Sequence, residues 1–326
     1  MKLPQRRQFL HLAAGAAALS ALPRIARAQG YPTRPVRIIV GFATGGPLDI
    51  STRLIGQWLS ERLGQQFIVE NRPGAGGNLA TEAVVRSRPD GYTLLAASAS
   101  NAWNATLYDN LNFNFLRDIV PVATLTRQGG VMLVNPSIPA NSIPEFIAYA
   151  KANPHKINMG SGGPGSAAHL YGELFKTMAN VDLVHVPFRG GAPALMALLG
   201  DQVQVFFGPV SVSIENIKSG KVRPLGVTTA GRMDLLPNVP PIGDFVPHYD
   251  AIAWDGVGAP KDTPDEIVAR LNAEINAAFA NQGFKARLAD LGLEPFPGSP
   301  GEFGKFLVEY TEKWAKVIRA ANIKAE

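Results

Sequence analysis

Apolar and polar residues alternate along the chain in short blocks that predict strands and helices in turn. Residues 36–40 form a β-branched run between a proline and a glycine, which is typical of a buried strand. From about residue 48 to 63 the apolar positions follow helical spacing, and Gly64 predicts the end of that helix. We also expect strands at 67–70 and 92–97, separated by a helix at 78–87. This β-α-β-α-β order predicts a parallel sheet with helices on its faces.

The middle of the chain repeats the alternation and predicts a second α/β domain. An irregular stretch is expected at 98–115, then an extended run at 119–126 and a strand at 131–134. The second domain is expected to contain strands at 157–159, 183–186, 203–207 and 224–228, with helices at 142–153, 166–178, 192–199 and 210–218. A proline-rich connection at 233–248 and an extended segment at 250–257 would return the chain to the first domain.

Three sequences of the capping-box type predict helix starts, at Ser142–Glu145, Thr263–Glu266 and Ser299–Glu302. The second helix is expected to end near Ala280, and the third near Ala321. The last helix carries one apolar stripe, made of Phe303, Phe306, Leu307, Tyr310, Trp314 and Val317. Such a stripe predicts that the helix docks on a core.

This order of elements predicts an α/β fold of two lobes in which the second domain is inserted into the first. We expect residues 31–130 and 251–326 to form domain 1 and residues 131–250 to form domain 2. Two crossings between the domains would form a hinge, and the cleft between them is the natural place for a ligand.

The first 28 residues are interpreted as an export signal. Lys2, Arg6 and Arg7 precede an alanine-rich apolar stretch, and Ala26-Arg27-Ala28 has the form of a cleavage site. Arg6-Arg7 resembles the twin-arginine signal, with the general secretory route as the alternative. Cleavage after Ala28 would release the mature protein outside the cytoplasm.

The signal also explains the charge of the chain. It holds five basic residues and no acid, so the net charge of +5 for the whole chain falls to zero for the mature part. A protein without excess positive charge is not expected to bind nucleic acid. Cysteine is absent, which excludes disulfides and cysteine metal sites.

The four histidines of the mature part show no metal-binding spacing; they are His155, His169, His185 and His248. No metal or other cofactor is therefore expected. A serine hydrolase that uses Ser161 with His169 or His185 stays open as an alternative, although no G-x-S-x-G sequence is present.

Three loops of small residues, at 41–49, 72–78 and 160–166, each precede a predicted helix. Unpaired backbone N–H groups at a helix start, together with the helix dipole, favour an anion, and glycine lets a ligand approach the main chain. Residues 160–165 also match G-x-G-x-x-G, but the next strand ends at Val186-Pro187 and not at an acid. The pattern therefore favours an anion-binding cleft over a dinucleotide site.

Several single residues are candidates for the cleft. Asp49 lies in the first turn of its helix, where it either complements the helix dipole and caps the loop, or fixes the loop so that Thr44–Gly46 face the cleft. Arg189 follows a strand and precedes a helix, so its guanidinium is a candidate to grip a carboxylate, with a surface role as the alternative. Four aromatic residues stand near strand ends and pack in the core or line the pocket; they are Phe42, Trp103, Phe207 and Trp254.

With these residues in place, the mature chain resembles the periplasmic receptors of tripartite tricarboxylate transporters, called Bug receptors. The resemblance rests on ordered motifs, namely Tyr31–Arg37, Gly45-Gly46 with Asp49 and Arg53, Glu70–Gly77, Gly91–Leu95, Gly160–Ser166 with His169-Leu170, Pro187–Gly190, and Ala259-Pro260 with Thr263-Pro264. It implies the type II periplasmic-binding-protein (Venus flytrap) fold. It also implies a non-enzymatic receptor that binds a mono-, di- or tricarboxylate and delivers it to a two-component membrane transporter.

The resemblance also implies that main-chain groups and waters of the loops Phe42–Pro47 and Gly160–Ser166 hold one carboxylate, while variable residues meet the far end of the ligand. Together with the candidates above, the ligand-binding residues are expected to be Phe42, Thr44, Gly45, Gly46, Pro47, Asp49, Asn78, Ser98, Ser161, Gly162, Gly165, Ser166, Arg189, Gly190, Phe207, Gly208 and Trp254. The chain departs from the family where Arg189 replaces a common lysine, Gly208 replaces a frequent acid, and Ser51-Thr52 replaces a small apolar pair. We expect a monomer, and presentation of the ligand to a sensor protein is the alternative to transport.

Overall fold

The computed structural model describes residues 30–325. The expected export signal, residues 1–28, lies outside the described residues. The chain divides after Thr33, and the fold below is that of the residues from Arg34 onward.

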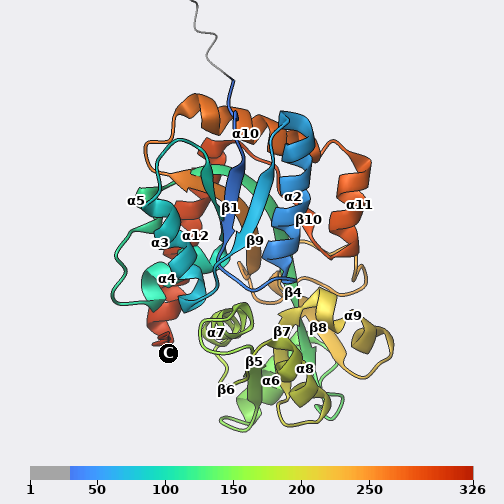
Figure 1. Cartoon of the computed structure of the whole chain (residues 1–326). Coiled ribbons are helices and arrows are strands. Elements are labelled where there is room, and N and C mark those ends of the chain that lie inside the picture. Colours follow the sequence, from blue (N-terminus) through green and yellow to red (C-terminus); the bar gives the residue numbers. More distant parts are fainter. Residues whose placement is uncertain (1–29, 326) are drawn as a thin grey trace, which may run out of the picture. The chain divides into compact units, whose positions relative to one another are not determined.

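Three parallel strands form one end of the sheet, as the sequence predicts. β1 (Val36–Val40) lies between β2 (Phe67–Asn71) and β3 (Thr93–Ser98). Helices α2 (Pro47–Leu63) and α3 (Asn78–Val85) connect these strands, with the short η1 (Ala75–Gly77) before α3 (Figure 1). Gly64 ends α2 in the left-handed conformation expected of a glycine at this position.

The strand β4 (Ile119–Val134) connects this end of the sheet to the other. It pairs antiparallel with β9 (Ile252–Pro260) along its first part, and with β7 (Val205–Pro209) and β8 (Arg223–Val227) along its last part. The sequence predicted two separate segments here, and that prediction is wrong. Gly129 and Gly130 interrupt the apolar pattern but stay extended, and glycine is needed because a Cβ on Gly129 would lie 2.4 Å from Thr229.

The predicted second α/β segment is present beyond β4. Strands β5 (Asn158–Ser161), β6 (Val184–Pro187) and β7 run parallel in the order β7-β5-β6. The helices between strands are α6 (Ile143–Ala152), α7 (Ala167–Ala179), α8 (Gly191–Leu199) and α9 (Val210–Lys218), followed after β8 by η2 (Ile242–Asp244). The α/β fold class is therefore confirmed, whereas the predicted domain boundaries stay a prediction.

The stretch predicted to be irregular, 98–115, is instead mostly helical. It forms α4 (Ala99–Leu107), and α5 (Phe115–Asp118) follows. The side chain of Asn101 accepts a hydrogen bond from the Ser98 backbone and donates one to Thr81. The apolar pattern of α4 is too weak to predict a helix. Hydrogen bonds to other elements, such as the one to Thr81, stabilise the helix instead.

Two of the three expected capping boxes do not form in full. At Ser142 the Glu145 carboxylate accepts a hydrogen bond from the Asn141 backbone and not from the Ser142 backbone. The Thr263 hydroxyl donates to the Pro260 carbonyl, and α10 (Asp265–Ala278) begins after Pro264 without a side-chain cap. A separate helix that the sequence did not predict, α11 (Gln282–Asp290), follows α10 and is capped by Asn281, and then β10 (Glu294–Pro295) pairs with β4. Ser142 caps α6 by accepting a hydrogen bond from the Glu145 backbone.

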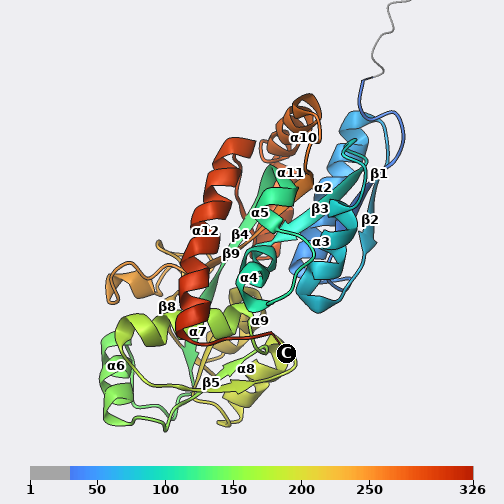
Figure 2. The same cartoon turned by 90° about the vertical axis from the view of Figure 1, so that its left-hand side faces the viewer.

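The last helix, α12 (Pro300–Ala320), packs its predicted stripe on the core. Ser299 and Glu302 form the complete capping box at its start. The helix contacts α10, α4 and α7 along its length (Figure 2). The Tyr310 hydroxyl donates to the Ile252 carbonyl at 2.6 Å, which fixes α12 on β9. Within residues 30–325, no helix combines the length and the hydrophobicity that a bilayer crossing requires.

We predict that Trp314→Ala lowers the free energy of unfolding by about 3–5 kcal/mol, because it leaves a cavity in the core. Trp314 is fully buried and its ring lies within 6.0 Å of the rings of Trp103, Tyr171 and Tyr310. Urea denaturation measures the change. Val308→Ala on the same helix is the control, since Val308 is 45% exposed, and equal losses in the two variants would contradict the packing described here.

A cavity at three helix N-termini

A cavity of about 380 Å³ opens beside the ends of several strands. Its lining comes from the loop before α2, the start of α4, the loop before α7, and β9. The lining residues are Phe42, Pro47, Leu48, Gly76, Ser98, Ala99, Ser100, Trp103, Asn104, Leu107, Tyr108, Gln128, Pro164, Gly165, Ser166, Ala167, Ala253, Trp254, Asp255 and Ala325.

The N-terminal turns of three helices reach this cavity. Pro47 and Leu48 begin α2, Ala99 and Ser100 begin α4, and Ala167 begins α7. The first N–H groups of a helix have no partner inside the helix, and the dipole places partial positive charge at this end. Three such ends at one cavity favour a bound anion.

The described part of the lining lacks the basic side chains that commonly hold an anion. Lysine, arginine and histidine are all absent from the lining residues, and Asp255 is the one carboxylic acid among them. An anion in the cavity would therefore be held by neutral donors: backbone N–H groups, hydroxyl groups and amides.

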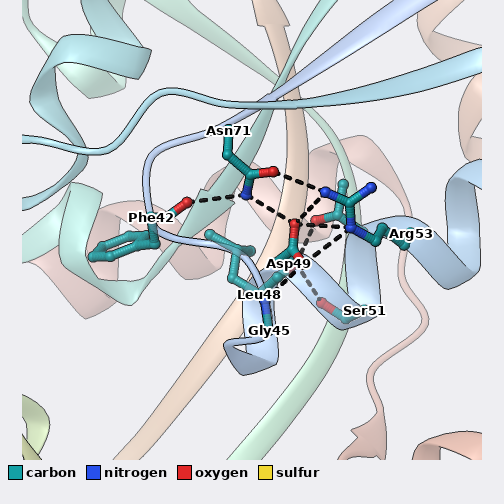
Figure 3. Close-up of polar contacts among 8 residues, drawn as sticks. Phe42, Gly45, Leu48, Asp49, Ser51, Arg53 and Asn71 are labelled. Carbon is teal, nitrogen blue, oxygen red and sulfur yellow. Dashed lines mark hydrogen bonds and ion pairs between the residues drawn. The ribbon is translucent and has the colours of Figure 1, made fainter.

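The carboxylate of Asp49 holds the loop before α2 in place through several hydrogen bonds (Figure 3). Its carboxylate accepts hydrogen bonds from Gly45 N at 2.9 Å, from Arg53 Nε at 3.0 Å and from Asn71 Nδ2 at 2.8 Å. Burial acts to raise the pKa of Asp49, but the bonds from Arg53, Gly45 and Asn71 outweigh it and leave the pKa below its ordinary value. Asn71 also donates to the Phe42 carbonyl, so this network fixes the loop at both ends.

Two stacked histidines brace the loop before α7. The rings of His169 and His185 lie 3.6 Å apart and nearly parallel. Nδ1 of His169 accepts the Gly165 N–H at 3.2 Å, and Nε2 of His185 lies 2.6 Å from the Ser161 hydroxyl. Gly165 has φ 69°, and a Cβ there would lie 2.8 Å from Leu107, so the loop requires glycine at this position.

Both histidines are held neutral. Burial lowers the pKa of His169 to about 3, with the charges of His185 and Lys176 acting in the same direction. Burial likewise lowers the pKa of His185 to about 4, and Lys176 contributes. Because Nδ1 of His169 accepts a hydrogen bond, this ring carries its proton on Nε2, which lies 3.7 Å from the Glu173 carboxylate.

Asp255 is a site residue that the sequence reasoning missed. It is 4% exposed on β9, and Oδ2 lies 3.1 Å from the Ser51 hydroxyl and 3.3 Å from the Thr126 hydroxyl. Burial raises the pKa of Asp255 to about 7, although both hydroxyl contacts act to lower it. The one hint in the sequence was Ser51, a polar residue where the family has a small apolar one, because its hydroxyl contacts Asp255.

A second cavity, of about 630 Å³, lies next to the first. It is lined by Tyr108, Gly162, Gly163, Pro164, Pro187, Phe188, Arg189 and Ala325, of which Tyr108, Pro164 and Ala325 also line the first cavity. Arg189 is therefore a basic residue beside the first cavity and outside its lining.

The candidate residues from the sequence are distributed over these places. Phe42, Pro47, Ser98, Gly165, Ser166 and Trp254 line the first cavity, and Gly162 and Arg189 line the second. Asp49, Ser161 and Gly45 support the two loops, and Asn78 accepts a hydrogen bond from the cavity residue Asn104. Thr44, Gly46 and Gly190 lie in the loops without lining either cavity.

Two candidates lie in β7 and away from both cavities. Phe207 is completely buried and packs on Phe175, with ring centroids 5.5 Å apart. Gly208 is covered by Phe206, since a Cβ at Gly208 would lie 2.1 Å from that ring. These two residues were candidates because they stand near the end of a predicted strand. That position does not show which side chains of β7 point into the core. In residues 30–325, no group of three or more histidine, cysteine or acidic side chains is arranged to hold a metal ion.

Known proteins resemble this chain along most of its length. The sequence profile of a family described as "Tripartite tricarboxylate transporter family receptor" matches residues 51–323. Protein BugT of Bordetella pertussis is 33% identical over 300 residues, which cover 91% of this chain and 92% of BugT.

Solved structures agree with this match. The Rhodopseudomonas palustris protein Rpa4515, solved with adipate, is 35% identical, with a TM-score of 0.78 over 90% of this chain and 99% of that chain. MatC from the same species, solved with bound malate, is 31% identical, with a TM-score of 0.74 over 88% of this chain and 100% of that chain. These likenesses confirm the two-lobed periplasmic-binding-protein fold.

The histidine pair predicts an effect of pH on stability. An unfolded histidine titrates near pKa ~6.5, so the unfolded state binds more protons than the folded state below that pH. The stability that neutral His169 and His185 contribute is complete above about pH 6.5 and is lost as the pH falls towards their folded values. Asp255 acts in the opposite direction between its ordinary pKa of 3.8 and about 7, so variants are needed to separate the two.

We predict that His169→Gln reduces the loss of stability between pH 6.5 and 5 by up to about 1.4 kcal/mol per pH unit. Urea denaturation at several pH values measures the slope. The exposed His248 supplies the control His248→Asn, which should leave the slope of the wild-type protein unchanged. An identical slope in His169→Gln and the wild-type protein would show that the histidine pair does not control it.

Proposed function

Because the chain belongs to the tripartite tricarboxylate transporter receptor family, we propose that it captures a small organic carboxylate and delivers it to the membrane transporter. The observation that carries the proposal is the convergence of the N-termini of α2, α4 and α7 on one cavity. Helix N-termini attract anions without a cationic side chain, and a carboxylate fits the donors available. The volume of about 380 Å³ is in the range used for small ligands.

Dicarboxylates are the favoured class of ligand. Two related proteins that share the fold were solved with adipate and with malate, both of which carry two carboxylates. We propose that one carboxylate binds the helix starts in the first cavity. The second carboxylate would extend towards the second cavity, where Arg189 offers a bidentate partner.

We also propose the cellular setting that this role requires. Residues 1–28 would direct export and be removed after Ala28, which leaves the receptor in the periplasm. Residues 31–130 with 251–326 and residues 131–250 would act as two domains that close on the ligand, and a monomer suffices for this. Delivery to a sensor protein is the second possible destination, and it would use the same ligand site.

A catalytic role is not favoured. Ser161 lies at 2.6 Å from His185, a distance that suits a nucleophile and its base. However, Ser161 is completely buried, and its hydroxyl oxygen also accepts the Gly163 N–H at 3.1 Å. We therefore propose that the pair braces the loop and that the protein is not an enzyme.

A negative charge placed in the cavity should compete with the ligand. We predict that Ser100→Glu weakens the binding of adipate by about 2 kcal/mol, the repulsion of two unit charges roughly 8 Å apart at an effective dielectric constant of about 20. The folded protein should tolerate the change, because an acid in the first turn of α4 suits the helix dipole. Isothermal titration calorimetry measures the affinity, after a thermal-shift screen of organic acids has shown binding.

Gln282→Glu is the matched control, since it adds the same charge at the start of α11, away from both cavities. Its affinity for adipate should equal that of the wild-type protein. Unchanged affinity in Ser100→Glu, or turnover of a chromogenic ester without any carboxylate binding, would refute the proposed function.

Arg189 has a separate test. If Arg189 holds the far carboxylate, Arg189→Ala should weaken a dicarboxylate by about 1.5–3 kcal/mol, the value of a hydrogen bond to a charged group. A monocarboxylate of similar length should lose much less, because it has no second carboxylate. Calorimetry measures both affinities. Equal losses of binding free energy for the two ligands would show that Arg189 does not contact the second carboxylate.

A further inference from the structure

Asp255 occupies an unexpected position for an acid in a site that binds anions. Its neighbours across the sheet are Ser98 on β3 and Thr126 on β4, and Ser51 approaches it from α2. It is almost fully buried, yet it lines the cavity directly beside Trp254. An ionised carboxylate there would repel a bound anion.

Among the described residues, the hydrogen bonds of Asp255 reach only one of its two carboxyl oxygens. Both hydroxyl groups, of Ser51 and of Thr126, reach the same oxygen, Oδ2. Within residues 30–325, Asp255 has no hydrogen bond to Oδ1. The Ser51 hydroxyl has one proton, which it shares between Oδ2 of Asp255 and the Leu48 carbonyl, each 3.1 Å away. Because both hydroxyl groups lie against Oδ2, a proton on the carboxyl group belongs on Oδ1, and Oδ1–H is then a donor available to a ligand in the cavity.

In the part of the chain that the structure describes, residues 30–325, no basic side chain forms an ion pair with Asp255. Several charged residues of the surrounding elements have partners other than Asp255. On α2, Asp49 pairs with Arg53, Arg62 with Glu274, and Glu61 accepts a hydrogen bond from Gln57. Glu82 of α3 pairs with Arg86, and Arg127 of β4 pairs with Glu294. α4 and β3 carry no charged residue. On α12, Tyr310 donates to the backbone of β9, and Lys313 donates to the Asp250 carbonyl. Burial without a cation favours the neutral acid, and the pKa of Asp255 accordingly rises to about 7.

We propose that Asp255 binds the ligand as a neutral carboxylic acid, donating a hydrogen bond from Oδ1–H to a ligand carboxylate, so that ligand binding is coupled to uptake of one proton. This inference rests on the proposed function, because it needs a carboxylate in the first cavity. Two carboxyl groups in contact share one proton, since both cannot be ionised side by side at low cost. The proton comes from solvent and goes to Asp255 when the ligand enters.

The coupling has a defined direction. In the empty receptor Asp255 loses its proton near pH 7, whereas the bound ligand holds the proton on Asp255 to a higher pH. Affinity should therefore be nearly constant below about pH 6.5 and fall about tenfold for each pH unit above pH 7.5. Adipate, the probe, is fully ionised throughout this upper range, so its own titration does not contribute.

The experiment is calorimetry of adipate binding between pH 6 and 9, in pairs of buffers with different enthalpies of ionisation. The wild-type protein should take up close to one proton per adipate at pH 8.5. Asp255→Asn, which keeps a neutral donor, should bind adipate with no proton uptake and with an affinity that does not change with pH. The exposed acid of α11 supplies the control Asp290→Asn, which should behave as the wild-type protein.

Ser51→Ala provides a second test that does not alter the acid. Loss of a hydroxyl contact at Oδ2 makes ionisation of Asp255 harder, so the fall in affinity should move to higher pH. A merely structural role of Asp255 would not move it. Binding of adipate with an affinity that is independent of pH, or that rises with pH, would overturn the inference and leave the proposed function standing. Failure of both adipate and malate to bind at any pH would overturn both.

Discussion

The structure depends on keeping the starts of three helices exposed to one cavity. Backbone N–H groups at the starts of α2, α4 and α7 are the main charge-favouring donors available to an anion, because none of the described lining residues is basic. Hydroxyl groups and amides of the lining add neutral donors. Such donors work only when the loops that present them are rigid. Asp49 holds the loop before α2, and the stacked pair of His169 and His185 holds the loop before α7.

A charged group holds one of these loops, and neutral groups hold the other. Asp49 stays charged because Arg53, Gly45 and Asn71 all donate to it. His169 stays neutral because it is buried, and its Nδ1 accepts the Gly165 N–H, while partial burial lowers the pKa of His185. Neither brace lines the cavity. A ligand in this cavity would meet mostly main-chain groups and neutral side chains, and Asp255 is the one acid among the described lining residues. The proposed coupling of binding to a proton therefore rests on Asp255.

The sequence predicted the parts of this arrangement that local pattern determines. α2 and α7 follow glycine-rich loops and have clear apolar periodicity, so their starts were placed correctly. α4 was missed because its buried face mixes small residues with the polar Asn101 and Asn104, so it lacks a clear apolar stripe, and its first turn depends on the contact of Asn101 with Thr81. Asp255 was missed because its burial depends on β9 lying between β3 and β4, which are far away in the sequence. The pairing of Ser161 with His185 likewise depends on the adjacent strands β5 and β6.

A crystal structure of the protein with a bound dicarboxylate tests the central claim most directly. We predict that one ligand carboxylate lies within hydrogen-bonding distance of backbone N–H groups at the starts of at least two of α2, α4 and α7, with no lysine or arginine contacting that carboxylate. A carboxylate held instead by a basic side chain, or bound outside the cavity, would contradict the account.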